Sequence, residues 1–330
     1  MSGTEELDKE GMRLLRQILS EIPPGPPSLE SLNAGLLSLE KKKGWDNLRS
    51  IILKAVYSTN HFHWLDEVLF KFIESKGKGI AAPIFLEIAE SRGKNDPAAQ
   101  VALQAFARIG PRKQVLKTLV KTILAKPEDI IFQIIAARCL SSFKEEEAAD
   151  AVGSTLIKGQ GVSRLDEMGK AEQSLSVEYA CAQSLIEMKT ERAASWLCAV
   201  HIFRSDSAMV KKPLLEMPGK AMPYLLLIIP KSKKNECERA AALAVELGGG
   251  KSAIGLFEAK LREEGNEPQR QGILGALSAL RKAQESSGKS GLPSGNSDLN
   301  GLKLERIFRQ PRAGARQGIG LPLRAVRQTK

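Results

Sequence analysis

Apolar residues recur at intervals of three and four along most of the chain, a spacing that predicts amphipathic helices. In residues 115–123 the valines, leucines and isoleucine fall on one helical face, and lysines and threonines fill the other. The breaks between such segments coincide with Gly, Pro, Asn and Asp. Strand signals are nearly absent: no alternation of period two is sustained, and the one Asn-Gly pair is Asn300-Gly301. The predicted fold class is therefore all-α.

A weak internal repeat organises these helices. The last apolar residue before each turn recurs, and four of its six spacings fall between 33 and 36 residues. The spacing of 45 is explained by a polar insertion around Gly159–Gln173, and the spacing of 59 leaves room for a degenerate unit around Pro218–Lys231. The repeating positions are Leu39, Ile73, Ile109, Phe143, Met188, Leu247 and Leu280.

Each period is typical of two helices of about 12 to 16 residues joined by a short turn. Small residues inside the helices, as in Ala193-Ala194 and Ala240–Ala242, allow neighbouring helix backbones to approach closely. A single helical hairpin cannot bury both of its flanks, whereas several stacked hairpins can. We therefore expect stacked helical hairpins rather than one compact core.

Three segments resemble HEAT-like (armadillo-type) helical repeats: Asp96-Pro97 through Phe106, Asn235 through Val245, and Glu267-Pro268 through Leu280. The resemblance covers residues 28–284. It implies a right-handed α-solenoid of stacked hairpins, with armadillo-like and other helical repeats as alternatives within the same class.

Two terminal regions differ from this array. Residues 1–27 combine an amphipathic capping helix at 5–22 with a proline-rich linker, Pro23-Pro24-Gly25-Pro26-Pro27. Residues 285–330 are rich in Ser, Gly and Asn, then basic, and lack apolar periodicity, so we expect a disordered, flexible tail. The predicted domains are thus 1–27, 28–284 and 285–330.

Charge is concentrated in that tail. The formal net charge is +11, and residues 303–330 contribute eight basic residues against one acid, Glu305. The planar guanidinium suits carboxylate or phosphate, so we expect the tail to contact an acidic protein surface, with nucleic acid or acidic lipid as alternatives. A tail that only aids solubility, with no dedicated partner, is a further alternative. The candidate partner-binding residues are Arg306, Phe308, Arg309, Arg312, Arg316, Arg324 and Arg327.

Candidate reactive residues give no catalytic, cofactor or metal site. The four cysteines form no C-x-x-C pair and lie in helical segments, which indicates reduced thiols in or near the core. His61-Phe62-His63 is the one histidine cluster, but residues two apart on a helix face different ways, so a helix start capped by Asn60 explains it better than zinc. No G-x-S-x-G or H-E-x-x-H motif occurs.

The segment Gly248–Ser252 is similar to the end of a phosphate-binding P-loop. A full loop requires glycine where this chain has Val245, and a strand where this chain has a predicted helix. We interpret it as an inter-helix turn with a glycine C-cap after Leu247. Some HEAT-like proteins are alkylpurine DNA glycosylases, and others are bilin lyases. None of the indoles, at Trp45, Trp64 and Trp196, matches the glycosylase pocket at a defined spacing, so no catalytic residue is assigned.

These observations lead to a non-enzymatic scaffold or adaptor that binds a protein partner on the solenoid surface. One alternative is a nucleic-acid-binding, repair-related protein whose groove is lined by Lys113, Lys117, Lys121, Lys211 and Lys212. Another is a lyase-type enzyme on the same scaffold. No apolar run approaches the roughly 20 residues of a membrane span, and the N-terminus is acidic rather than signal-like, so we expect a soluble, cytoplasmic protein without cofactor.

Overall fold

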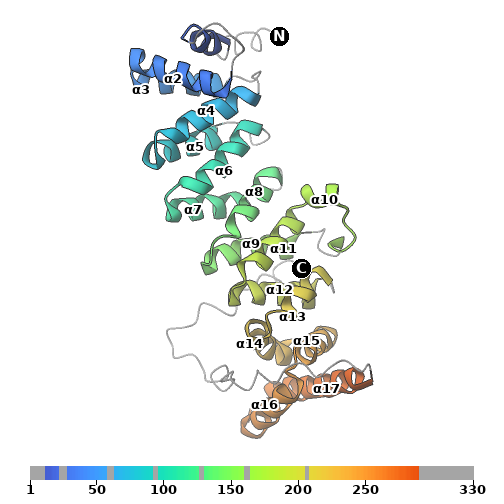
Figure 1. Ribbon diagram of the computed structural model, residues 1–330. Coiled ribbons are helices and arrows are strands. Elements are labelled where there is room, and N and C mark those ends of the chain that lie inside the picture. Colours follow the sequence, from blue (N-terminus) through green and yellow to red (C-terminus); the bar gives the residue numbers. More distant parts are fainter. Residues whose placement is uncertain are drawn as a thin grey trace. The chain divides into compact units, whose positions relative to one another are not determined.

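The computed structural model describes residues 12–21, 28–57, 63–91, 96–125, 130–159, 164–204 and 208–289 (Figure 1). These ranges consist of helices and short connections and contain no strand, which confirms the predicted all-α class. Within the same ranges, no helix has both the length and the apolar character that crossing a bilayer requires. The chain contacts divide into two compact units, Met1–Ile135 and Ala136–Lys330, a division that the repeat pattern did not predict.

Unit 1 is built from helices that pack on their near neighbours in the chain. The main contacts join each helix to the next one or to the next but one, from α2 through α7. A helical segment at residues 12–19 precedes them. The helices are α2 (Leu29–Lys43), α3 (Trp45–Tyr57), α4 (His63–Ser75), α5 (Lys78–Ser91), α6 (Pro97–Ile109), α7 (Arg112–Ile123) and α8 (Ile130–Leu140), which crosses the boundary between the units.

Unit 2 is centred on α12, in which every residue from Arg192 to Ile202 is buried. This helix contacts α9, α11, α13, α14 and α15. The last helix, α17, continues to Lys289, five residues beyond the predicted boundary at 284. The helices are α9 (Glu146–Lys158), α10 (Lys170–Ser174), α11 (Val177–Met188), α12 (Glu191–Phe203), α13 (Ala208–Leu215), α14 (Pro218–Ile228), the 3-10 helix η3 (Ile229–Lys231), α15 (Lys234–Glu246), α16 (Gly250–Glu263) and α17 (Glu267–Lys289).

The repeat spacing matches the helix order closely. Each of the first three periods contains two helices: α3 and α4, then α5 and α6, then α7 and α8. The period of 45 residues contains the extra short helix α10, and the period of 59 contains four α-helices, α12 to α15, together with η3, as expected for an additional unit. The repeat position at Leu280 was wrong in one respect, because it lies within α17 rather than at a helix end.

The N-terminal helical segment packs on unit 1 through buried apolar residues. Leu14 and Ile18 are fully buried. Just after it, the carboxylate of Glu21 accepts hydrogen bonds from Ser38 Oγ at 2.7 Å and from Lys42 Nζ at 2.8 Å, both on α2. These contacts agree with an amphipathic helix at this end, whereas the proline-rich linker lies outside the described residues.

The predicted polar insertion also contributes to the core of unit 2. Leu165 and Met168 are buried. The carboxylate of Asp166 accepts hydrogen bonds from the backbone N–H groups of Ala208 and Met209, at 2.8 and 2.9 Å. Because these are the first residues of α13, the insertion caps a helix that begins 42 residues later in the chain.

The glycine-rich segment after α15 forms a helix-ending turn, as predicted. Gly248 adopts φ of +80°. Its N–H donates to the carbonyl of Val245 at 2.9 Å, and the N–H of Gly249 donates to the carbonyl of Ala244 at 3.0 Å. This is the hydrogen-bond pattern of a Schellman motif. Both amides are therefore used by the helix end and do not form a phosphate cradle.

Gly248→Ala should destabilise the protein by about 1 kcal/mol, because an L side chain is strained at positive φ. Gly255→Ala is the matched control: Gly255 lies inside α16 with no atom within 4 Å of a built Cβ, so alanine there should stabilise by up to about 1 kcal/mol. Urea unfolding followed by circular dichroism measures both. Equal effects of the same sign would contradict the assigned turn.

Candidate functional site

The tail residues predicted to bind a partner, Arg306 to Arg327, lie outside the described residues. The predicted cationic groove can be located. Lys113, Lys117 and Lys121 lie on α7 of unit 1, whereas Lys211 and Lys212 lie on α13 of unit 2. Lys211 forms an ion pair with Glu246 at 2.9 Å. The residues of the predicted groove therefore form two sets, one in each unit. The set on α7 is the more exposed of the two.

The three α7 lysines follow one another at four-residue intervals on one side of the helix. All three are exposed, while Val115, Leu119 and other apolar residues on the opposite side are buried, as predicted. A four-residue interval advances about 6 Å along a helix, so the three cations extend over about 12 Å. No lysine of this set forms an ion pair with any residue that the structure describes.

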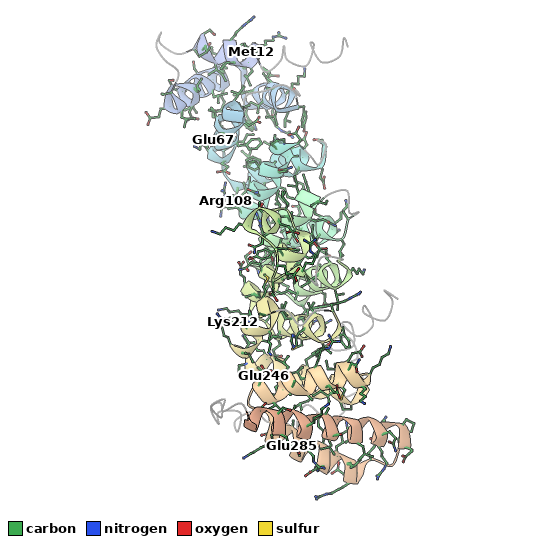
Figure 2. All side chains as sticks on the ribbon, turned by 90° about the vertical axis from the view of Figure 1, so that its right-hand side faces the viewer. Met12, Glu67, Arg108, Lys212, Glu246 and Glu285 are labelled. Carbon is green, nitrogen blue, oxygen red and sulfur yellow. The ribbon has the colours of Figure 1, made fainter. Side chains whose placement is uncertain are left out.

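Every charged residue of α6 and α7 is basic. The sequence contains no Asp or Glu from Pro97 to Pro127. Arg108, near the end of α6, is paired with Glu74 of α4. Figure 2 draws the side chains on the ribbon and labels Arg108, which belongs to α6. This hairpin therefore offers a local positive potential to an anionic ligand.

A second candidate surface is a groove between α16 and α17 in unit 2. Its volume is about 570 Å³. Leu274 is 43% exposed there, and Arg281 and Glu258 form an ion pair across the groove at 2.7 Å. The groove combines three leucines with charged side chains, a mixture that protein interfaces also show. The lining residues are Glu258, Leu261, Arg262, Leu274, Leu277, Ser278, Arg281, Lys282 and Glu285.

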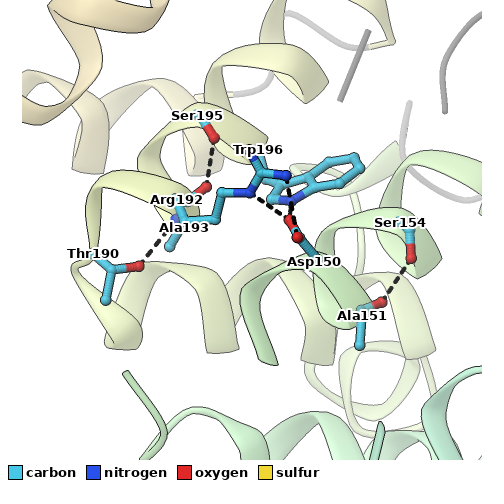
Figure 3. A network of polar contacts seen from close by, with 8 residues as sticks. All are labelled: Asp150, Ala151, Ser154, Thr190, Arg192, Ala193, Ser195 and Trp196. Atoms are coloured by element: carbon cyan, nitrogen blue, oxygen red, sulfur yellow. Dashed lines mark hydrogen bonds and ion pairs between the residues drawn. The ribbon is translucent and has the colours of Figure 1, made fainter. Parts of the chain in front are cut away.

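The most connected polar cluster joins α9 to α12 (Figure 3). Arg192 donates from Nε to Asp150 Oδ1 at 2.5 Å and from Nη2 to Oδ2 at 3.1 Å. The indole N–H of Trp196 donates to Asp150 Oδ1 at 2.8 Å. Arg192 and Trp196 lie one helical turn apart on α12, so both reach the same carboxylate. A bidentate pair of this kind is strong and directional.

This cluster is arranged for stability rather than for reaction with a substrate. Trp196 is 1% exposed, and the carboxylate of Asp150 is already engaged by three donors. A Cβ built on Gly153 would lie 2.2 Å from the Trp196 ring, so this glycine allows the indole to pack against α9. The sequence analysis missed the cluster, because Asp150 and Trp196 are 46 residues apart.

The other indoles have different surroundings. Trp45 packs against Phe72 with ring centroids 6.3 Å apart, and Lys76 Nζ lies 4.2 Å from the Phe72 centroid and 5.6 Å from that of Trp45. Lys76 also forms an ion pair with Glu40. These contacts join α2, α3 and α4 in unit 1. The side chain of Trp64 lies outside the described residues.

All four cysteines are free thiols, as predicted, and three of them, Cys181, Cys198 and Cys237, are buried. Among the described residues no group of three or more His, Cys, Asp or Glu is placed to hold a metal ion. His61 and the side chain of His63 lie outside the described residues, so the predicted absence of a zinc site there stays a prediction.

Comparison with protein-family models, with curated proteins and with solved structures finds no match to this chain. The many helices agree with a helical repeat fold. No family match assigns that fold to the HEAT or armadillo class.

Asp150→Asn should lower the free energy of unfolding by roughly 2 kcal/mol, because it removes the negative charge that the buried Arg192 pairs with on α9. The loss should be smaller than for a fully buried pair, since the Asp150 side chain is 28% exposed. Glu258→Gln, which removes a solvent-exposed partner of Arg281, is the control and should change stability by less than about 1 kcal/mol. Similar losses in the two variants, measured by urea unfolding, would contradict the assigned importance of the buried cluster.

The thiols should react slowly with an alkylating reagent in the folded protein. Burial raises the pKa of Cys139 to about 11, and burial together with the nearby Glu238 carboxylate raises the pKa of Cys237 to about 11. Burial also raises the pKa of Cys181 and Cys198. Since only the thiolate reacts, labelling of Cys139 should accelerate as the pH rises toward about 11.

Peptide mass spectrometry after timed labelling with iodoacetamide measures this reactivity site by site. All four cysteines should label rapidly in denaturant at about pH 8.5, where an ordinary thiol is half ionised. Because the folded state holds these protons more tightly, the thiol contribution to stability is present below the unfolded pKa and is lost as the pH rises through the folded pKa. Rapid labelling of native Cys198 at neutral pH would contradict the buried core around α12.

Proposed function

We propose that the chain is a non-enzymatic, cytoplasmic scaffold that binds a protein partner, and that each unit is a right-handed α-solenoid of HEAT-like hairpins. The observation that supports this most directly is the local order of packing. The main contacts of unit 1 all join helices that are adjacent or one apart in the chain. Helices stacked in this way bury their flanks against neighbours and leave an outer face of each hairpin for binding.

Exposed apolar side chains on these faces support a partner of protein type. Val101 on α6 is 49% exposed, Leu175 after α10 is 66% exposed and Leu274 in the α16/α17 groove is 43% exposed. Protein interfaces combine such apolar residues with a charged rim, and the groove has both. We further propose that the arginine-rich tail, residues 290–330, adds an electrostatic contact to an acidic partner.

A nucleic-acid-binding function is the second candidate, and one observation favours it. The segment from Pro97 to Pro127 contains no carboxylate, and the structure describes five exposed basic residues in it: Arg108, Arg112, Lys113, Lys117 and Lys121. Lysines placed in this way suit phosphate contacts. Titration with duplex DNA at low and moderate salt tests this candidate, because phosphate contacts give a steep dependence of affinity on salt.

A chain ending at Lys289 should unfold within about 2 °C of the full chain, while its capture of a partner weakens. Purified full-length and shortened chains serve as baits in extracts of the source cell, and the enriched protein is then reconstituted from pure components. A full-length variant in which Arg306, Arg309 and Arg312 are glutamine separates the effect of charge from that of length. A large fall in the unfolding temperature would show that the tail belongs to the folded body, and undiminished binding by both variants would exclude it from the interface.

A further inference from the structure

The exposed side of α7 carries an apolar residue in line with its three lysines. Leu124 directly follows the helix, keeps helical backbone angles of −86° and −1°, and is 53% exposed. At 100° per residue, Leu124 lies between Lys113 and Lys117 in helical projection, and half-buried Val120 lies at the edge of the same side. We define the α7 face as Lys113, Lys117, Lys121 and Leu124.

The charge of the α7 face is not neutralised within the described structure. Its three lysines form no ion pair with a described residue, in contrast to Lys71 on α4, which pairs with Glu67. The cation of the neighbouring helix α6, Arg108, is already paired with Glu74. A ligand that supplies carboxylates at matching intervals would therefore form new ion pairs without breaking existing ones.

The apolar residue distinguishes between two kinds of anionic ligand. A phosphate backbone is recognised by the cations alone, and it gains little from an exposed leucine. An amphipathic helix with acidic residues beside an apolar stripe matches both features, because its own residues at four-residue intervals also advance about 6 Å. A helix packed along α7 can therefore pair its carboxylates with successive lysines while its apolar stripe covers Leu124.

We propose that the α7 face binds an acidic amphipathic helical segment of a partner protein. This inference rests on the proposed scaffold function and specifies the chemistry of the partner. Each solvent-exposed ion pair contributes little by itself, so the affinity depends on several pairs together with burial of Leu124. Binding should consequently weaken as salt is raised, with a residual apolar contribution that salt does not remove.

The test uses the full chain and a designed acidic helix as the probe. The fluorescent peptide is about five turns long, with glutamates at four-residue intervals beside a leucine stripe. A second peptide with glutamine in place of every glutamate is its control. The triple variant Lys113→Gln, Lys117→Gln and Lys121→Gln removes three charges from the α7 face. The control triple variant, Lys41→Gln, Lys54→Gln and Lys78→Gln, removes three exposed charges elsewhere in unit 1. The two triple variants therefore have the same net charge.

Fluorescence anisotropy should show that the acidic peptide binds the full chain and that the α7 triple variant binds about tenfold more weakly. The control triple variant and the wild-type chain should bind alike. Leu124→Ser should weaken binding of the peptide severalfold, and circular dichroism should show unchanged unfolding for every variant. Duplex DNA, added as a competitor, should displace the peptide poorly.

Three results would overturn the inference. The first is equal loss of binding in the two triple variants, which would show a response to net charge alone. The second is tight binding of duplex DNA that depends on the α7 lysines but not on Leu124, which would assign the face to nucleic acid. The third is absence of acidic-peptide binding. With any of these three results, capture of a cellular partner by the full chain would leave the scaffold function standing, and only the assignment of this face would fail.

Discussion

Helices that are apolar on more than one flank must be covered by neighbours on each of those flanks, and this requirement governs both units. The clearest case is α12, in which every residue from Arg192 to Ile202 is buried and which contacts five other helices. No isolated hairpin could satisfy such a helix. Burial of these apolar flanks thus contributes most to stability, and a polar group buried between the helices must have its own partner there.

The Asp150 cluster shows how a buried charge is given such a partner. A guanidinium on a fully buried helix is costly unless its charge and its donors are matched. Asp150 on α9 supplies a bidentate partner for Arg192 and an acceptor for the Trp196 indole, and Gly153 on the same helix leaves room for the ring. The arrangement ties α9 to α12 with defined geometry, which apolar packing alone would specify less tightly.

The same principle explains why the outer faces differ from one another. At exposed positions packing does not constrain the side chain, so its charge can vary. The exposed side of α7 carries lysines and no carboxylates, whereas α16 and α17 form an ion pair across a groove. The two surfaces therefore differ in charge. Helices that pack on their neighbours accommodate this variety, because substitutions on an exposed face leave the buried flanks unchanged.

The sequence by itself determined most of what depends on neighbours within a few turns of the chain. It predicted the helical class, the buried and exposed sides of α7, the helix-ending turn at Gly248 and the free thiols, because each follows from periodicity, backbone sterics or the composition of one segment. It also predicted that the long period between Met188 and Leu247 holds extra helices. Only the tertiary structure decided three other features. They are the boundary between the two units, which falls within α8, the pairing of Asp150 with Arg192 across 42 residues, and the groove that α16 and α17 form. These features arise where distant segments meet, and a single sequence carries no spacing rule for such meetings.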